Sequence, residues 1–274
     1  TEVNFEAGDQ IGFTMTKVNG TEAYADNAAL TFDGTVFSGD LKWYADAYSE
    51  ADVYAYYPYN ANGTPTAYFV VEDQTDGIAK ADLMAAVKKG VLPTPNAITM
   101  VFKHLMTKLV INIDNQSGAE VTGVEIGGCR LVTGLDISEM ALTKYTDIVI
   151  EAEPLIKAYE ATAGKVWQAI VIPDKAKLEI IVNLSNGKKI TQPLAEMTLK
   201  SGGQYSINAR LIQDNMIVSA SGEIENWTDE GEIGFDGEGT TEELPVEFTE
   251  YEGYFVYDGV EYKTVKLADG NTWM

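Results

Sequence analysis

Residues 177–188, which read KLEIIVNLSNGK, decide the fold class of this chain. Residues 177–184 are rich in β-branched and other apolar side chains, the composition of a β-strand. Ser185, Asn186 and Gly187 follow directly, and a short run of such residues before a second strand-like segment is typical of a hairpin turn. The segment therefore predicts two adjacent antiparallel strands.

Similar segments recur along the whole chain, separated by turns rich in Gly, Asn and Asp. They are residues 10–16, 30–37, 53–57, 67–71, 108–112, 167–172 and 205–212. This pattern predicts an all-β fold of antiparallel sandwiches, the first half being the less regular. One stretch differs, since Ile78, Leu83, Met84 and Val87 fall roughly on one helical face. Residues 77–89 therefore predict a short surface helix or helical turn that ends at Gly90.

The domain organisation follows from length and from two changes in composition. A chain of 274 residues is long enough for two β-sandwich domains. Pro93 and Pro95 interrupt strand pairing, so we expect one domain over residues 1–97 and a second over residues 98–236. An acidic, Gly-rich linker begins at Asp236, and residues 237–274 are interpreted as this linker followed by an extension.

The extension carries a strong hairpin pattern. Residues 254–257 and 260–267 alternate like strands, and Asp258-Gly259 between them favours a type I′ turn. A segment of roughly 30 residues cannot support a core of its own. We therefore expect it to add to a sheet, either in its own chain or in a neighbouring one.

Composition narrows the possible partners. The chain has 42 acidic and 19 basic residues, a formal net charge of -23, and 45% hydrophobic residues. That apolar content supports a folded core, whereas the negative charge opposes binding to nucleic acid or to anionic membrane surfaces. Copies of this chain would repel one another, so a polymer of it requires directional pairing.

The sequence offers little for catalysis. His104 and Cys129 are the single histidine and the single cysteine, and we interpret them as a structural histidine and a buried apolar residue. No nucleophile elbow or phosphate-binding glycine loop is present, and paired carboxylates are uninformative in so acidic a chain. We therefore predict no enzyme activity, catalytic residue, cofactor or metal. Calcium binding by residues 229–243 is the weaker interpretation of a stretch that is typical of a solvated linker.

A tyrosine cluster leaves a binding function open. Residues 54–59 read YAYYPY, and Tyr56, Tyr57 and Tyr59 could stack against sugar rings. Tyrosines in strands more often pack in the core or across the sheet, which is the interpretation we favour. A glycosidase with two carboxylates in one cleft is a third hypothesis.

Four segments, in order, resemble the Bacteroidales fimbrillin family, the subunits of type V pili. They are residues 5–13 (FEAGDQIGF), 52–59 (DVYAYYPY), 100–109 (MVFKHLMTKL) and 227–231 (WTDEG). The resemblance covers about residues 5–235. It implies two transthyretin-like (Greek-key) β-sandwich domains, a lipoprotein precursor, proteolytic removal of an N-terminal strand, and polymerisation by strand exchange. The family's lipidated cysteine and propeptide strand are missing from this sequence, as expected of a matured or shortened chain.

These observations lead to one hypothesis of function. We expect a structural pilin subunit, located in a pilus on the outer-membrane surface of a Gram-negative bacterium, without membrane contact in its mature chain. Its C-terminal strands would insert into an adjacent identical or homologous subunit, whose acceptor groove is unknown, and so form an open-ended filament that supports adhesion. The predicted donor residues are Tyr254, Phe255, Val256, Tyr257, Val260, Tyr262, Val265, Leu267 and Trp273.

The alternative is a tip adhesin or surface lipoprotein that binds host or microbial glycans. In that case the extension would fold onto the second domain of its own chain.

Overall fold

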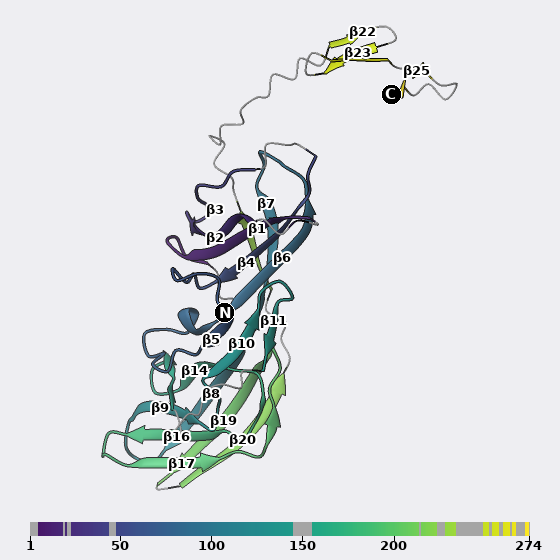
Figure 1. The fold of residues 1–274 in the computed structure, drawn as a ribbon. Helices are drawn as coiled ribbons and strands as arrows, with labels where there is room; N and C mark the ends of the chain where they lie inside the picture. The colour runs from purple at the N-terminus through teal and green to yellow at the C-terminus, as the bar shows by residue number, and fades with distance from the viewer. Residues whose placement is uncertain are drawn as a thin grey trace. The chain divides into compact units, whose positions relative to one another are not determined.

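The computed structural model describes residues 5–18, 20, 23–43, 48–144, 155–213, 215–223 and 228–233, together with short strands after residue 248. Residues 1–236 form one compact unit and residues 237–274 form a second. Strands dominate the described residues (Figure 1), so the predicted all-β class is confirmed. The finer division of the chain at residues 97 and 236 stays a prediction. No described residue belongs to a helix long and apolar enough to cross a membrane.

A closed barrel occupies one part of the first unit, with the strand order β1-β2-β3-β21-β7-β6-β4. Its strands are β1 (Gln10–Lys17), β2 (Ala23–Phe32), β3 (Phe37–Ser38), β4 (Ala51–Tyr57), β6 (Met84–Val91), β7 (Ile98–His104) and β21 (Thr228–Ile233). In β7, buried Ile98, Met100 and Phe102 alternate with exposed residues, which is the two-residue period of a strand with one face in the core.

Aromatic side chains fill the inside of this barrel. The ring of Phe5 lies 4.8 Å from Phe37, 5.2 Å from Phe102 and 5.5 Å from Tyr57, each pair packed edge to face. Such geometry adds about 0.5–1.5 kcal/mol per pair beyond area burial. The segment that precedes β1 is thus anchored in the barrel core.

Strand β21 joins the barrel from far along the sequence. It pairs antiparallel with β7 over all of its residues, from Thr228 opposite Lys103 to Ile233 opposite Ile98. The expectation of a solvated linker from residue 229 is therefore wrong for residues 229–233. The pairing satisfies backbone groups on the edge of β7, which would otherwise lack partners.

The rest of the first unit is a sandwich of two main sheets. The five-stranded sheet has the order β13-β14-β8-β19-β20, and the four-stranded sheet has the order β12-β9-β16-β17. Their strands are β8 (Thr107–Gln116), β9 (Val121–Gly127), β12 (Ile156–Lys157), β13 (Tyr159–Thr162), β14 (Val166–Val171), β16 (Glu179–Leu184), β17 (Lys189–Pro193), β19 (Gln204–Ile212) and β20 (Asn215–Glu223). The hairpin predicted around residues 185–187 is confirmed, since β16 pairs antiparallel with β17.

Smaller elements complete the first unit. The strands β5 (Ala67–Phe69), β10 (Val132–Asp136) and β11 (Ala141–Thr143) form a three-stranded sheet, and β15 (Lys175–Ala176) pairs with β18 (Met197–Thr198). Between β8 and β19 the pairing is parallel, with Asn112 opposite Asn208.

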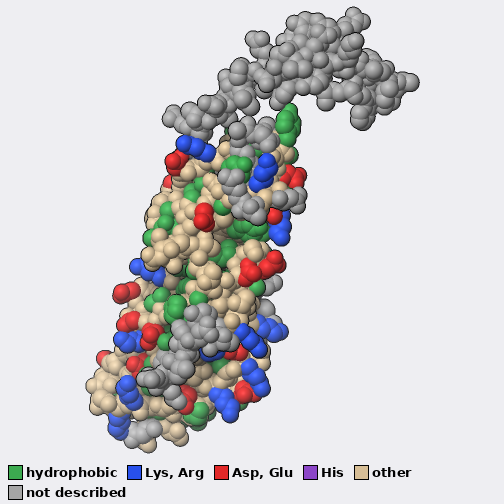
Figure 2. All heavy atoms as spheres, in the orientation of Figure 1, with side chains coloured by type: hydrophobic (Ala, Val, Ile, Leu, Met, Phe, Trp, Pro, Cys, Tyr) green, Lys and Arg blue, Asp and Glu red, His purple; other side chains and the backbone are tan. Residues whose placement is uncertain are grey.

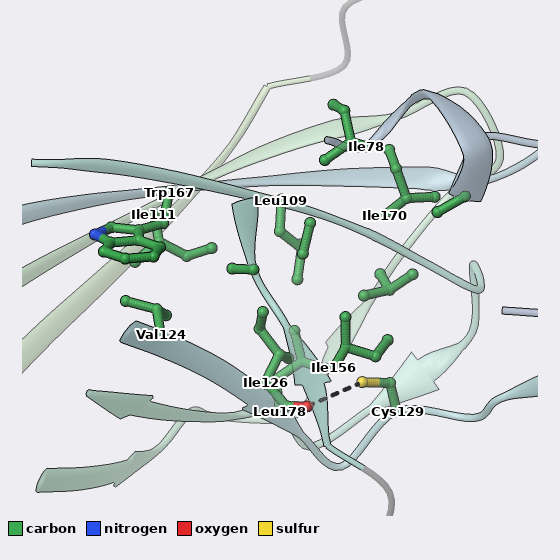
Figure 3. Packing of buried hydrophobic residues seen from close by; sticks show 14 of the residues in the cluster. Ile78, Leu109, Ile111, Val124, Ile126, Cys129, Ile156, Trp167, Ile170 and Leu178 are labelled. Carbon is green, nitrogen blue, oxygen red and sulfur yellow. Dashed lines mark hydrogen bonds between the residues drawn. The ribbon is translucent and has the colours of Figure 1, made fainter. Parts of the chain in front are cut away.

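The sandwich core lies between its two main sheets (Figure 3). Leu109, Ile111 and Trp167 of the five-stranded sheet pack in one cluster with Val124 and Ile126 of the four-stranded sheet. Burying one large aliphatic side chain contributes about 1.5–3 kcal/mol. Cys129 belongs to the same cluster, which confirms its interpretation as a buried apolar residue.

Of the short helix or helical turn predicted over residues 77–89, a single helical turn is confirmed, and the rest of the prediction is wrong. This stretch contains a short 3-10 helix, η1 (Ala79–Ala81), and then strand β6, which pairs with β4 from Met84 opposite Tyr57 to Val91 opposite Ala51. Ala, Leu, Met and Lys have high helix propensity, but propensity is a weak preference that tertiary packing overrides. Here β4 supplies the backbone partners.

The second unit contains two small groups of strands. The strands β22 (Thr249–Tyr251), β23 (Tyr254–Tyr257) and β24 (Val260–Lys263) form a sheet, and β25 (Val265–Lys266) pairs with β26 (Thr272–Trp273). Tyr257 lies opposite Val260, so the predicted hairpin is confirmed. Its second strand was predicted over residues 260–267, whereas β24 ends at Lys263 and β25 pairs with β26 instead.

Candidate assembly site

The structure places most of the predicted donor residues on strands of the second unit. Tyr254, Phe255, Val256 and Tyr257 form β23, while Val260 and Tyr262 lie on β24. Val265 and Trp273 face each other across the β25–β26 pair. Leu267 lies outside the described residues. Whether these residues insert into another subunit is not tested by their position, and this role stays a prediction.

These strands form two small sheets, one of β22, β23 and β24 and one of β25 and β26. Strand β23 is central, with β22 on one side and β24 on the other. A two- or three-stranded sheet of this size has too little apolar surface to be stable without a partner. Strands β22 and β24 are therefore chemically suited to further main-chain pairing, the basis of β-augmentation.

The barrel has three short ladders. Strands β3 and β21 share the single residue pair Phe37–Ile233. Two residue pairs join β2 to β3, and two join β6 to β7. By contrast, β1 and β4 pair from Gly12 to Lys17 without interruption. A strand from another subunit would have to replace the fewest main-chain hydrogen bonds where the existing ladders are shortest.

The tyrosine cluster is core rather than surface. Tyr56 is 2% exposed and packs in the sandwich cluster, whereas Tyr57 is 5% exposed and packs in the barrel cluster. The Tyr56 hydroxyl donates to Asn27 Oδ1 at 2.6 Å. Burial raises the pKa of both phenols. These two side chains are not available as a sugar-stacking platform, and the core interpretation is confirmed for them.

His104 is buried at the end of β7 against Asp82. Its Nδ1 lies 2.6 Å from Asp82 Oδ2, and the two side chains are 1% and 0% exposed. Burial raises the pKa of the Asp82 carboxyl, while the contact with His104 opposes that effect. A histidine without solvent access cannot contact a substrate, so the role of His104 is structural. Asp82 was missed by the sequence analysis because an isolated Asp in an apolar stretch carries no pattern.

One hollow of about 520 Å³ lies on the five-stranded sheet, lined among others by Asn112, Asn208, Asp114 and Arg210. Asn112 Nδ2 donates to Asn208 Oδ1 at 3.0 Å, and Arg210 Nε donates to Asp114 Oδ2 at 2.8 Å. These groups satisfy one another across neighbouring strands, as cross-strand pairs on a solvent face commonly do.

Titratable groups do not assemble into a reaction centre among the described residues. No cluster of three or more His, Cys, Asp or Glu side chains suited to a metal ion occurs in that part of the chain. Acidic and basic side chains are interspersed over the face shown in Figure 2. In its described part, the chain has the features of an all-β structural or binding protein.

Comparison with known proteins narrows this class. The family model described as "Fimbrillin-like" matches residues 1–227. The chain therefore belongs to the fimbrillin-like family. Membership supports a pilus-related role in adhesion at the cell surface, in a family of structural proteins that are generally not enzymes. No match was found among curated proteins.

Two solved structures share the fold. A proposed cell adhesion protein from Bacteroides uniformis has a TM-score of 0.66 and 23% identity, covering 82% of this chain and 94% of that one. A proposed cell adhesion protein from Bacteroides ovatus has a TM-score of 0.63 and 22% identity, covering 81% and 88% respectively.

Proposed function

We propose that this chain is a pilus subunit that joins copies of itself, or homologous subunits, by adding its C-terminal strands to the sheet of the next subunit. The observation that supports this most is the second unit. Its strands form a three-stranded sheet of β22, β23 and β24 and a two-stranded pair of β25 and β26, which are too few to support a core.

Charge explains why the junction would use strands. Each copy carries a formal charge of -23, so two copies repel each other at long range. A row of main-chain hydrogen bonds is directional and depends little on side-chain charge. Contacts of this kind are heterologous, so they continue into an open-ended filament on the cell surface.

The pairing register of β23 and β24 shows which of their residues share a face of the hairpin. Phe255 lies opposite Tyr262, and Tyr257 lies opposite Val260. Because opposite residues share a face of an antiparallel sheet, these four positions form one face and Tyr254 and Val256 belong to the other. We place the first face against the acceptor. The β3–β21 connection of the barrel is the proposed acceptor, since one residue pair holds it.

The glycan-binding alternative has less support. It relied on exposed tyrosines, and Tyr56 and Tyr57 are buried. A glycan array probed with the full chain would revive it if binding were lost on mutation of the less buried Tyr59.

Deletion of residues 244–274 tests the proposal. Wild-type protein should form filaments visible by electron microscopy, and the deletion should remain monomeric by light scattering. Filaments that persist after the deletion, or wild-type protein that stays monomeric at every concentration, would contradict the proposal.

A matched pair of variants tests the proposed face. Phe255→Glu/Tyr262→Glu should abolish filaments, whereas Tyr254→Glu/Val256→Glu should leave them in place. The reverse result would assign the opposite face. A synthetic peptide of residues 249–263 in excess should also block assembly, and a scrambled peptide should not.

A further inference from the structure

All buried charged residues of the described chain gather at one place. Among its Asp, Glu, Lys, Arg and His residues, only Asp82, His104 and Lys108 are buried, with exposed fractions of 0%, 4% and 3%. Buried charges are expensive unless they compensate one another, so three of them in one position require an explanation.

The three residues come from the connection between the barrel and the sandwich. His104 ends β7 of the barrel, Lys108 lies near the start of β8 of the sandwich, and Asp82 follows η1. Asp82 Oδ2 contacts His104 Nδ1 at 2.6 Å, and Lys108 acts on the same carboxylate electrostatically. Asp82 Oδ1 accepts no hydrogen bond from the described residues. Burial, and to a smaller extent the charge of Asp82, raise the pKa of the Tyr57 and Tyr68 phenols.

Backbone contacts hold the same connection in place. Ser201 Oγ donates to the carbonyls of His104 and Leu105, and the amide of Gly202 donates to the carbonyl of Met106. On the other side, the amide of Leu105 donates to the carbonyl of Leu83. The turn from the barrel into the sandwich is therefore fixed from both sides.

The two apolar cores meet at this point. On β4, Tyr56 packs in the sandwich cluster and Tyr57 in the barrel cluster, and on β6 the same holds for Ala85 and Met84. Apolar contact of this kind is non-directional, so by itself it leaves room for the two parts to rotate or slide. A short charged hydrogen bond has a defined direction.

We propose that Asp82, His104 and Lys108 form a buried joint that sets the orientation of the barrel on the sandwich. Replacing a buried ion pair by apolar side chains of similar volume is often neutral or stabilising, so the joint contributes to specificity of orientation rather than to net stability. The proposal concerns the single chain and does not depend on polymerisation.

Distance measurements between two spin labels test the joint. Labels at Thr35→Cys, in the turn between β2 and β3, and at Ala195→Cys, in the sandwich, report the orientation in the full chain. Both sites are exposed, while the native Cys129 is buried and will not take the label. Pulsed electron spin resonance then gives the distribution of distances.

Two variants and one control are compared. Asp82→Leu/His104→Phe/Lys108→Met removes every charge of the joint, and Asp82→Asn removes one charge with little change of shape. Asp114→Asn breaks the exposed pair with Arg210, whose side chains are 50% and 60% exposed, and serves as the control.

Wild type and Asp114→Asn should give one narrow distance peak. The triple variant should fold, with an unchanged circular dichroism spectrum, and lose that narrow peak. If the triple variant fails to fold, the distance distribution of Asp82→Asn tests the proposal instead, because this variant should also broaden the peak. A narrow, unshifted peak in a folded triple variant, or in Asp82→Asn where the triple variant does not fold, would overturn the proposal.

Discussion

Ile233 of β21 lies opposite Phe37 of β3, and this one residue pair closes the barrel. Strand β21 is held mainly by β7 on its other side, where Gly231 lies opposite Met100. Barrel closure therefore depends on a short strand contributed from beyond the sandwich.

Gly231→Pro should weaken this closure, because proline cannot donate to a strand ladder. We expect a loss of about 1–3 kcal/mol in the free energy of unfolding, measured with urea. Deletion of residues 244–274 should leave the unfolding of the first unit unchanged. Equal stability of Gly231→Pro and wild type would show that β21 contributes nothing to the barrel.

Gly12 on β1 is required by a close neighbour. A Cβ atom at this position would lie 2.1 Å from Cε1 of Tyr56, which is itself fixed in the core. Gly12→Ala should therefore destabilise the protein by about 1–3 kcal/mol, the usual cost of overpacking. Gly123→Ala on β9, where the nearest atom would be 3.4 Å away, is the matched control and should cost much less in the same urea titration.

Cys129 should be unreactive in the folded protein. Burial raises the pKa of its thiol to about 12, and the side chain lies in the sandwich core. Because the thiolate is the reactive form, a disulfide reagent at pH 8 should modify it only after guanidinium unfolding. Rapid modification of native protein, followed by absorbance, would contradict the described packing.

The exposed pair Asp73–Lys157 predicts a small acid dependence of stability. A hydrogen bond from Lys157, helped by Thr75, lowers the pKa of Asp73 from 3.8 to about 2. A lowered folded-state pKa stabilises the protein above pH 3.8, and this contribution disappears as the pH falls toward 2. Asp73→Asn should reduce the acid dependence of unfolding in that range, and high salt should weaken the difference. Carboxyl titration by NMR checks the pKa directly.

Sequence reasoning succeeded where local pattern and tertiary role agree. Residues 180–182 are β-branched and apolar, and they form the buried centre of strand β16. In β6, by contrast, the residues favour a helix and the neighbouring strand β4 decides the outcome. Propensity could not reveal this, because the deciding partner is remote in the sequence.

The barrel strand β21 could not be predicted either. Residues 228–233 read TDEGEI, with one apolar residue and no alternation, so they look like a linker. They become a strand because β7 offers an edge to pair with. Of the candidate site, the hairpin over residues 254–263 was readable from its turn, whereas Asp82 beside His104 was not, since that contact depends on the fold.

The parallel pairing of β8 with β19 has a consequence for how the chain acquires its fold. Asn112 and Asn208, which meet in this pair, are 96 residues apart. Closing such a large loop lowers the chain's conformational entropy before the contact can stabilise the fold. Folds rich in contacts between distant residues therefore form slowly. While the chain is being synthesised or exported, β8 must wait for β19, and its uncovered edge is open to mispairing during that interval. A chaperone that shields β8 until β19 arrives would therefore be expected to raise the yield of folded protein.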